Sequence, residues 1–366
     1  MKDQQKDWKW IFTLYDFVKV LFFVYLFLVS IDLMGAAFRA SGRGLTQTLM
    51  NATSDPFHGL IIGIVVTSIV QSSSLTTSII VTMVGAGTLP LKSAVPMIMG
   101  ANIGTTVTNT IVSLGYLGRK TEFQRAFGAS IIHDMFNIYA TIIFFPLELY
   151  FGIISKTAMI LERSFAHIGG LKFSSPLKFI IQPLSKPIED FIGNHYVLLI
   201  VAFICLFFSL IQIVKNMKGI VVEKIESVLN RYLFRNAFIS LCFGFLFTAI
   251  IQSSSITTSI IVPLAGAGVL TIEQIYPYTL GANVGTTVTA LLAALAVGKD
   301  AAMIVAISHS VFNVSGIMIL YPLKMLPIGT AKFIAAFVAQ SKKHFIIFLT
   351  LFILFHIGSI VVITFH

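Results

Sequence analysis

Gln71-Ser72-Ser73-Ser74-Leu75-Thr76-Thr77-Ser78-Ile79-Ile80 occurs twice in this chain, the second time as Gln252-Ser253-Ser254-Ser255-Ile256-Thr257-Thr258-Ser259-Ile260-Ile261. Each copy is a run of amide and hydroxyl side chains between strongly apolar flanks. Such groups are costly to place in hydrocarbon unless each finds a hydrogen-bond partner. Two nearly identical runs of this kind therefore indicate two halves of one site.

The residues around the two runs repeat as well. An offset of 181 residues relates Gly63 to Gly244, Gly85 to Gly266 and Asn102 to Asn283. After a shorter loop in the second half, an offset of 176 residues relates His133 to His309 and Asn137 to Asn313. Two registers separated by one loop deletion indicate a duplicated unit.

The composition is that of a membrane protein. The 366 residues are 56% hydrophobic and only 11% charged, and the mean hydropathy is +0.91. These values predict an all-α polytopic protein embedded in the lipid bilayer of the cell (plasma or inner) membrane. The net charge is +10, and most of the basic residues lie between apolar blocks. In such positions basic residues orient the spans relative to an anionic inner leaflet. No nucleic-acid partner is expected.

Residues 1–150 are predicted to form the first repeat. Lys2, Lys6 and Lys9 precede an apolar span at 11–34, which places the amino terminus in the cytoplasm. At 57–87, two apolar arms shorter than the roughly 20 residues of a full span flank Gln71 to Ser74, which predicts a re-entrant hairpin. The next span, 91–117, is interrupted at 100–106 by Gly-Ala-Asn-Ile-Gly-Thr-Thr, and a further span follows at 126–147.

The second repeat, residues 194–325, has the same order of elements. A span at 195–214 is followed by Lys215 and other basic residues that favour the cytoplasm, then by a hairpin at 238–268, an interrupted span at 272–297 and a span at 301–321. Between the repeats lies a mixed linker, 151–193, expected outside. Residues 326–366 are an amphipathic segment and a last span at 345–364. Counting spans makes the second repeat inverted relative to the first, as in secondary transporters with broken helices.

A half-helix that begins in mid-membrane favours an anion, because it presents unpaired N–H groups and the positive end of its dipole. Two such ends with added hydroxyl and amide donors fit a small oxyanion such as phosphate or sulfate. The predicted phosphate-binding residues are Gln71, Ser72, Ser73, Ser74, Gln252, Ser253, Ser254, Ser255, Asn102 and Asn283.

A cation has to accompany that anion. Neither Ser-rich run and neither Gly-rich interruption contains Arg or Lys, whereas phosphate carries about two negative charges near neutral pH, and burying them alone is prohibitive. Hydroxyl and carbonyl oxygens are the ligands that a small alkali cation prefers. The predicted sodium ligands are Thr105, Thr106, Thr108, Thr286, Thr287 and Thr289.

Plainer interpretations exist for many of these residues. Ser and Thr in membrane helices more often serve helix packing than ligand binding. A supporting polar network that joins spans accounts equally well for four further residues, His133, Asn137, His309 and Asn313. The glycines lack the Lys of a P-loop, the two cysteines are isolated, and the serines have no matched base, so neither an enzyme nor a cofactor is expected.

With Gln-Ser-Ser-Ser, Gly-x-Asn-x-Gly-Thr-Thr and His-x-x-Phe-Asn each present twice, the chain resembles the type II sodium-dependent phosphate cotransporters and their bacterial relatives. The resemblance covers residues 60–148 and 238–323. It implies that Gln71 to Ser74 and Gln252 to Ser255 belong to the substrate and sodium region, and that Thr286 and Thr289 bind sodium. The chain departs from that family where Ala282 replaces a frequent hydroxyl residue, and in its short linker without Cys.

The combined prediction is a secondary active transporter that imports inorganic phosphate with sodium by alternating access. A sodium-coupled carrier of another small anion, sulfate or a dicarboxylate, is the nearest alternative, although no Arg is placed to clamp a carboxylate. A channel or a membrane scaffold that transports nothing is the alternative from another class.

Overall fold

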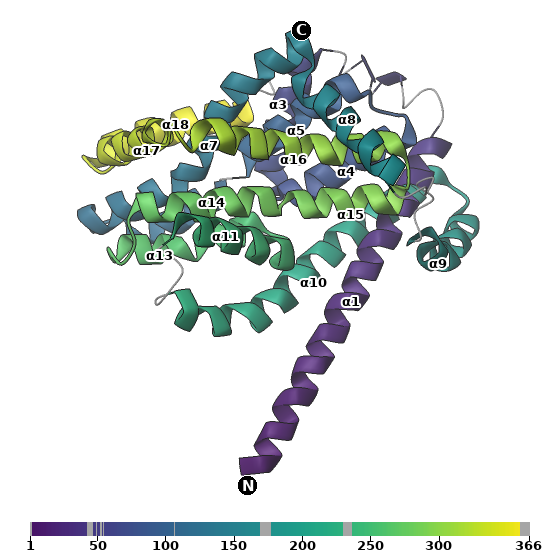
Figure 1. Ribbon diagram of the computed structural model, residues 1–366, viewed down its shortest axis with the longest axis horizontal. Helices are drawn as coiled ribbons and strands as arrows, with labels where there is room; N and C mark the ends of the chain where they lie inside the picture. Colours follow the sequence, from purple (N-terminus) through teal and green to yellow (C-terminus); the bar gives the residue numbers. More distant parts are fainter. Residues whose placement is uncertain are drawn as a thin grey trace.

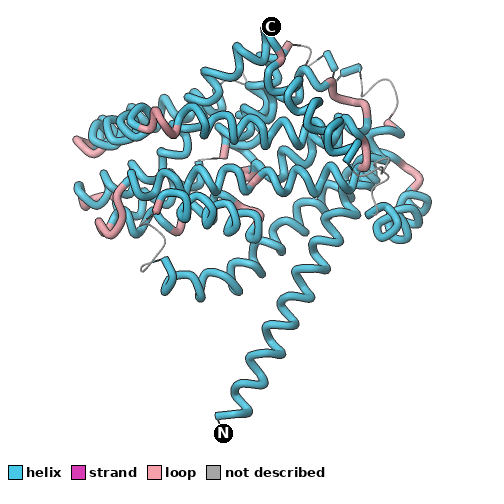
Figure 2. The backbone as a smooth tube through the Cα atoms, viewed as in Figure 1, coloured by secondary structure: helices cyan, strands magenta, loops and turns pink. Residues whose placement is uncertain are grey.

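The computed structural model describes residues 2–41, 47–48, 50–51, 53, 55–105, 107–168, 177–229 and 236–358. Within these ranges the chain is helical and contains no strand (Figures 1 and 2), as the composition predicts. The helices are α1 (Lys2–Ala40), α3 (Pro56–Val70), α4 (Ser73–Ala86), α5 (Leu91–Gly104), α6 (Val107–Ser113), η1 (Leu114–Tyr116), α7 (Lys120–Phe151), α8 (Ile153–Ile168), α9 (Leu177–Ile192), α10 (His195–Leu229), α11 (Ala237–Ile251), α12 (Ser254–Ser259), α13 (Ile261–Gly266), α14 (Ile272–Gly285), α15 (Thr287–Val297), α16 (Asp300–Leu320), α17 (Met325–Val338), α18 (Lys342–Ile353) and η3 (Leu354–Gly358).

Several helices are long and apolar enough to cross a membrane, which confirms a multi-pass protein. In the described ranges these segments are Phe17–Ala40, Lys120–Phe151, His195–Met217, Ile272–Val297 and Asp300–Leu320. Each coincides with a predicted span. The predicted span at 91–117 consists of the shorter α5, α6 and η1. The predicted last span, 345–364, begins in α18 and runs into residues 359–366, which lie outside the described ranges.

The first Ser-rich run lies at the turn of a helical hairpin. α3 ends at Val70, Gln71 adopts the left-handed conformation with φ 55°, and α4 begins at Ser73. Gly59 lies against Ser93 and Gly104 against Ser68, so α3 and α5 run parallel. Since α4 connects the end of α3 to the start of α5, it must run back in the opposite direction. The hairpin predicted at 57–87 is present, with Gln71 at its tip.

The second half repeats this geometry. α11 ends at Ile251, Gln252 adopts the same left-handed conformation with φ 63°, and α12 begins at Ser254. α11 and α14 run parallel, because Gly244 lies against Tyr278 and Gly285 against Thr248. The return arm consists of α12 and α13, which meet at Ile260.

Each hairpin packs against the opposite half of the chain. α4 and α15 run parallel, since Ser74 contacts Thr289 near their starts and Gly85 meets Val297 near their ends. α14 and α15 lie in line with each other (Figure 1). Because α4 runs opposite to α5, α14 also runs opposite to α5, its counterpart in the first half.

The second Gly-rich interruption does not open the helix. Thr286, between α14 and α15, keeps helical angles (φ −65°, ψ −23°), and its N–H bonds to the carbonyl of Asn283, three residues back. The helix tightens there instead of opening. Gly281 and Gly285 are used for close contact between α14 and α11, so these glycines serve helix packing and do not free carbonyl groups.

The predicted linker is helical where it is described. α8 begins directly after α7, and the Glu148 carboxylate accepts hydrogen bonds from the N–H groups of Ile154 (2.8 Å) and Ser155 (3.2 Å), which caps the new helix. α9 is attached to α1, because the Ser185 hydroxyl donates to Asp32 at 2.6 Å. Residues 169–176 lie outside the described ranges.

Candidate functional site

The three serines of each run have three different environments. The first, Ser72 or Ser253, is the N-cap of the return helix. Its hydroxyl accepts the N–H of Leu75 at 3.2 Å or of Ile256 at 3.4 Å. A side chain that caps a helix in this way stabilises the start of that helix. The first serine of each run therefore stabilises the tip of its hairpin.

The third serine connects the two halves. The Ser74 hydroxyl donates to the Gln252 carbonyl at 3.2 Å, and the Ser255 hydroxyl donates to the Thr105 carbonyl at 3.3 Å. Both serines are buried. The first contact joins residues 178 positions apart and the second joins residues 150 positions apart. The first is the meeting of the two runs that the repeat predicts.

The middle serine of each run is the one whose hydroxyl forms no hydrogen bond within the described part of the chain. Ser73 and Ser254 are 4% and 2% exposed, and neither hydroxyl donates to a group in the described part of the chain, although both carbonyls accept a threonine hydroxyl. A buried hydroxyl with an unused proton is a donor available to a ligand. Ser73 and Ser254 are therefore candidate anion ligands, as are Ser72 and Ser253, whose hydroxyls accept but do not donate and which line the cavity described below.

Each tip glutamine is held by a threonine of its own half. The Thr108 hydroxyl donates to Oε1 of Gln71 at 3.2 Å, and the Thr289 hydroxyl donates to Oε1 of Gln252 at 2.6 Å. The Gln252 amide also donates to the Ala249 carbonyl. Two predicted sodium ligands thus contact two predicted phosphate ligands, at equivalent places in the repeat.

Other candidate sodium ligands donate to carbonyl groups three or four residues back along the chain. The hydroxyls of Thr105, Thr286 and Thr287 donate to the carbonyls of Ala101 (3.0 Å), Asn283 (2.6 Å) and Val284 (2.8 Å). A hydroxyl that donates keeps its lone pairs, so a cation can still use them. Thr106 lies outside the described residues.

A buried cluster of histidine and asparagine joins the halves beneath the tips. His133 Nε2 lies 2.8 Å from Asn283 Oδ1, and His309 Nε2 lies 3.2 Å from Asn102 Oδ1. An amide oxygen only accepts, so Nε2 carries the proton in both histidines. Each histidine belongs to one half and each asparagine to the other, which makes the two contacts reciprocal.

Asn137 and Asn313 complete this cluster. Their amides donate to the backbone carbonyls of Asn102 (2.9 Å) and Asn283 (3.1 Å), and the Asn283 amide donates to Oδ1 of Asn137 (2.8 Å) and of Asn313 (3.2 Å). The side chains of Asn102 and Asn283 thus contact the cluster. Their role as phosphate ligands stays a prediction.

Asp134, next to His133 on α7, is a further buried polar residue. It is 3% exposed, and its Oδ1 has no hydrogen-bond partner among the described residues. An acidic side chain inside a membrane span is by default a candidate for ion binding. Its position does not follow from the repeat, because Ser310 occupies the equivalent place.

A cavity of about 400 Å³ opens where the two tips meet α10. Gln71, Ser72, Gln252 and Ser253 line one wall, and a stripe of α10 that ends at Lys215 lines the other. Both tips therefore face one space. The sequence placed Lys215 in the segment after the span, but the described helix continues through it, so the helical continuity of α10 brings a cation to the site.

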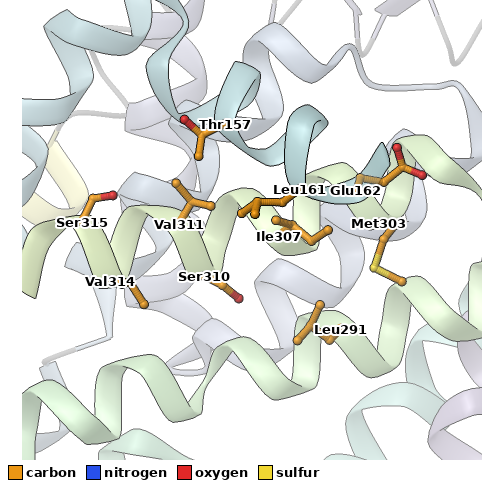
Figure 3. A pocket seen from close by; sticks show the side chains of 10 residues that line it. All are labelled: Thr157, Leu161, Glu162, Leu291, Met303, Ile307, Ser310, Val311, Val314 and Ser315. Carbon is orange, nitrogen blue, oxygen red and sulfur yellow. The ribbon is translucent and has the colours of Figure 1, made fainter. Parts of the chain in front are cut away.

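A larger cavity, of about 680 Å³, lies between α8, α15 and α16 (Figure 3). Its walls are mostly apolar side chains such as Leu161, Ile307 and Val311, with Glu162 at one end. None of the predicted ligands lines it, so size alone does not identify the site.

Comparison with known proteins agrees with these features. The model of the family described as Na+/Pi-cotransporter matches residues 26–173 and 205–338. The chain is 33% identical to sodium-dependent phosphate transport protein 2A of Ovis aries over 93% of its own length and 66% of that protein. It is 33% identical to the 2A protein of Rattus norvegicus over 90% of its own length and 64% of that protein.

A third relative is sodium-dependent phosphate transport protein 2B of Homo sapiens, 31% identical over 92% of this chain and 63% of that protein. The chain thus spans somewhat under two thirds of the length of these relatives. No solved structure matches it. The family model covers both copies of the Ser-rich run and both Gly-rich segments, and the chain belongs to the Na+/Pi-cotransporter family.

Proposed function

We propose that this protein is a secondary active transporter that imports inorganic phosphate together with sodium across the cell membrane. Its family and the names of its relatives support this proposal. The observation that carries it is the convergence of two equivalent Ser-rich tips on one cavity, with hydrogen bonds between the halves. A site made equally by two halves is suited to alternating access, because movement of one half against the other can expose it to either side.

We assign the phosphate to the two tips. Ser73 and Ser254 offer unused hydroxyl donors, and α4 begins at Ser73 with the free N–H groups of a helix start. Ser72, Ser74, Ser253 and Ser255 shape the tips, while Gln71 and Gln252 line the cavity. Asn102 and Asn283 hold the helices behind the tips through the cluster.

Sodium is assigned to the oxygen atoms beside the tips. Thr108 and Thr289 contact the tip glutamines, and Thr105, Thr286 and Thr287 lie at the turns between helices. A cation there lies close to the bound anion and offsets its charge in a site of low dielectric.

The orientation follows from the basic residues. α1 and α10 pack antiparallel, because Phe23 meets Phe208 and Lys19 shares a pocket with Lys215. The lysines before the first span and those at the end of the α10 span are then on one side, and we assign this side to the cytoplasm.

We further propose two inverted repeats, residues 1–150 and 194–325, with residues 151–193 as a linker and 326–366 as a carboxyl-terminal unit. The opposite directions of α5 and α14 support the inversion.

Labelled phosphate uptake into proteoliposomes tests the coupling. We expect uptake driven by an inward sodium gradient and none when potassium or choline replaces sodium. Labelled sulfate and a dicarboxylate, run in parallel, test the choice of anion. If phosphate uptake is equally fast without sodium, the proposed coupling is wrong. If sulfate but not phosphate shows counterflow, the proposed substrate is wrong.

The shared site predicts a particular result for Ser73→Ala and Ser254→Ala. A hydrogen bond to a charged group contributes roughly 1.5 to 3 kcal/mol, so each single change should weaken phosphate binding about tenfold or more. The double variant should depart from additivity because both donors serve one ligand. Binding to purified protein is the measurement, with Ser164→Ala on exposed α8 as the matched control. Strict additivity would indicate two independent sites.

A further inference from the structure

The residues that line the cavity at the tips show in which direction it extends. One wall is made by Gln71, Ser72, Gln252 and Ser253, and the α10 wall extends from Phe207 to Lys215. The span in α10 ends at Met217, so Lys215 lies in the last turn of that span. The cavity therefore runs from the Ser-rich tips to the end of α10 that carries the basic residues.

That end of α10 lies beside the start of α1. Lys215 also lines a second pocket of about 510 Å³, formed with Tyr15, Lys19 and Phe22 of α1. With both basic ends in the cytoplasm, as assigned above, the tip cavity opens toward the cytoplasm and Lys215 is at its mouth.

Lys215 supplies the positive charge along this path. The other residues that line the tip cavity are uncharged. Lys215 is exposed and forms no ion pair with a described carboxylate. A fixed cation at the mouth of a low-dielectric cleft raises the local concentration of anions.

We propose that the cavity between the two tips and α10 is the cytoplasmic path of phosphate, and that Lys215 is a positioning residue for phosphate at its mouth. This inference rests on the proposed function. It adds the route that phosphate takes, the side of the membrane to which that route opens, and the role of Lys215. Neutral donors hold the anion at the tips, where sodium offsets its charge. Once sodium has left, Lys215 provides a fixed positive charge on the way out.

The test compares the two faces of the membrane. Phosphate half-saturation is measured in right-side-out vesicles for the outer face and in inside-out vesicles for the cytoplasmic face, each with a sodium gradient directed into the vesicle. Lys215→Gln should raise the half-saturation concentration at the cytoplasmic face by about fivefold, the size of one exposed charge pair. At the outer face the value should change less than twofold. Lys215→Arg should restore the cytoplasmic value, and Lys299→Gln, an exposed lysine before α16, should leave both unchanged.

The outcomes separate this inference from the proposed function. If the unaltered protein takes up no phosphate with sodium in either kind of vesicle, the proposed function fails. If it does, equal shifts at both faces, a shift at the outer face alone, or no shift would each overturn the role of Lys215. High salt should reduce the difference between Lys215→Gln and the unaltered protein, since it screens an exposed charge.

A second measurement tests the path without altering the lysine. Ile211 on the α10 wall of the cavity is 48% exposed. In a background with Cys205→Ala and Cys242→Ala, Ile211→Cys should react with a membrane-impermeant anionic thiol reagent in inside-out vesicles. We expect no reaction in right-side-out vesicles, and slower reaction when sodium and phosphate are both present. Reaction from the outer face alone would overturn the cytoplasmic path.

Discussion

At the scale of single residues, the three neighbouring serines of each run have different roles. In each run the first serine caps a helix, the third bonds to the opposite half, and the second keeps its hydroxyl free. The division arises because Gln71 and Gln252 adopt left-handed angles, which ends one helix and starts the next within two residues. Threonines at the helix junctions likewise have hydroxyls that donate locally while their lone pairs remain available.

Thr286→Val tests one of those threonines. The change keeps the shape of the side chain but removes the oxygen, which now donates to the Asn283 carbonyl at 2.6 Å. If that oxygen binds sodium, the sodium concentration for half-maximal uptake should rise about tenfold, as for loss of a contact to a charged group. The phosphate requirement should change much less.

Thr279→Val is the matched control for this change. Thr279 lies on the same helix, is buried, and bonds to the carbonyl of Ile275 four residues back. Loss of the Thr279 hydroxyl should leave the sodium concentration for half-maximal uptake unchanged. Equal shifts in sodium and phosphate requirements for Thr286→Val would remove that residue from the ion site.

At the scale of elements, paired glycines set how close the helices come. A Cβ at Gly63 would overlap the carbonyl oxygen of Met97, and one at Gly244 would overlap that of Tyr278. Small residues let membrane helices approach closely and gain van der Waals contact. The close α3–α5 and α11–α14 pairs therefore place each tip level with the end of α5 or α14.

Gly63→Ala and Gly244→Ala should each destabilise the protein. Forcing a methyl group into a packed interface costs about 1 to 3 kcal/mol. A lower apparent melting temperature of the purified protein in detergent, with reduced uptake, is the expected result. Gly329→Ala in α17, where nothing lies within 4 Å of the added atom, should have no such effect. Unchanged melting of Gly63→Ala would mean that α3 and α5 can separate without loss.

At the scale of the whole molecule, the two halves are held together at their centre. The buried cluster of His133, Asn137, His309, Asn313, Asn102 and Asn283 leaves each member at most 1% exposed. Reciprocal contacts run from each histidine to the opposite half. A polar network inside a membrane protein is costly unless its groups are paired, so this cluster specifies how the halves meet.

His133→Ala and Asn283→Ala should be coupled in their effect on stability. Loss of one partner leaves the other buried and unpaired, which costs roughly 1 to 3 kcal/mol. Each single variant should melt at a lower temperature, and the double variant should lose less than the sum of the two. His133→Ala combined with Ser164→Ala, which are not in contact, should be additive. Additivity of the first pair would show that the 2.8 Å contact does not hold the halves together.

The sequence alone determined the fold class, the duplication and the position of both tips. Apolar blocks of spanning length can only be helices in a bilayer, because no other segment satisfies its own backbone there. The Gln-Ser-Ser-Ser runs predicted the hairpin tips, because polar residues between two apolar arms that are each too short to span the bilayer indicate a hairpin and not a straight span. The 181-residue offset indicated that the two tips belong to one site.

Tertiary structure alone decided how the members of each run divide their roles. Which serine keeps its hydroxyl free depends on what lies across the interface, since Ser74 meets the Gln252 carbonyl from the other half. The second Gly-rich segment interrupts an apolar stretch of the sequence, and only the structure shows that its glycines pack against α11. In the sequence Lys215 only follows the predicted span, because charge patterning does not reveal that the helix continues past its apolar stretch and that Lys215 lines a cavity.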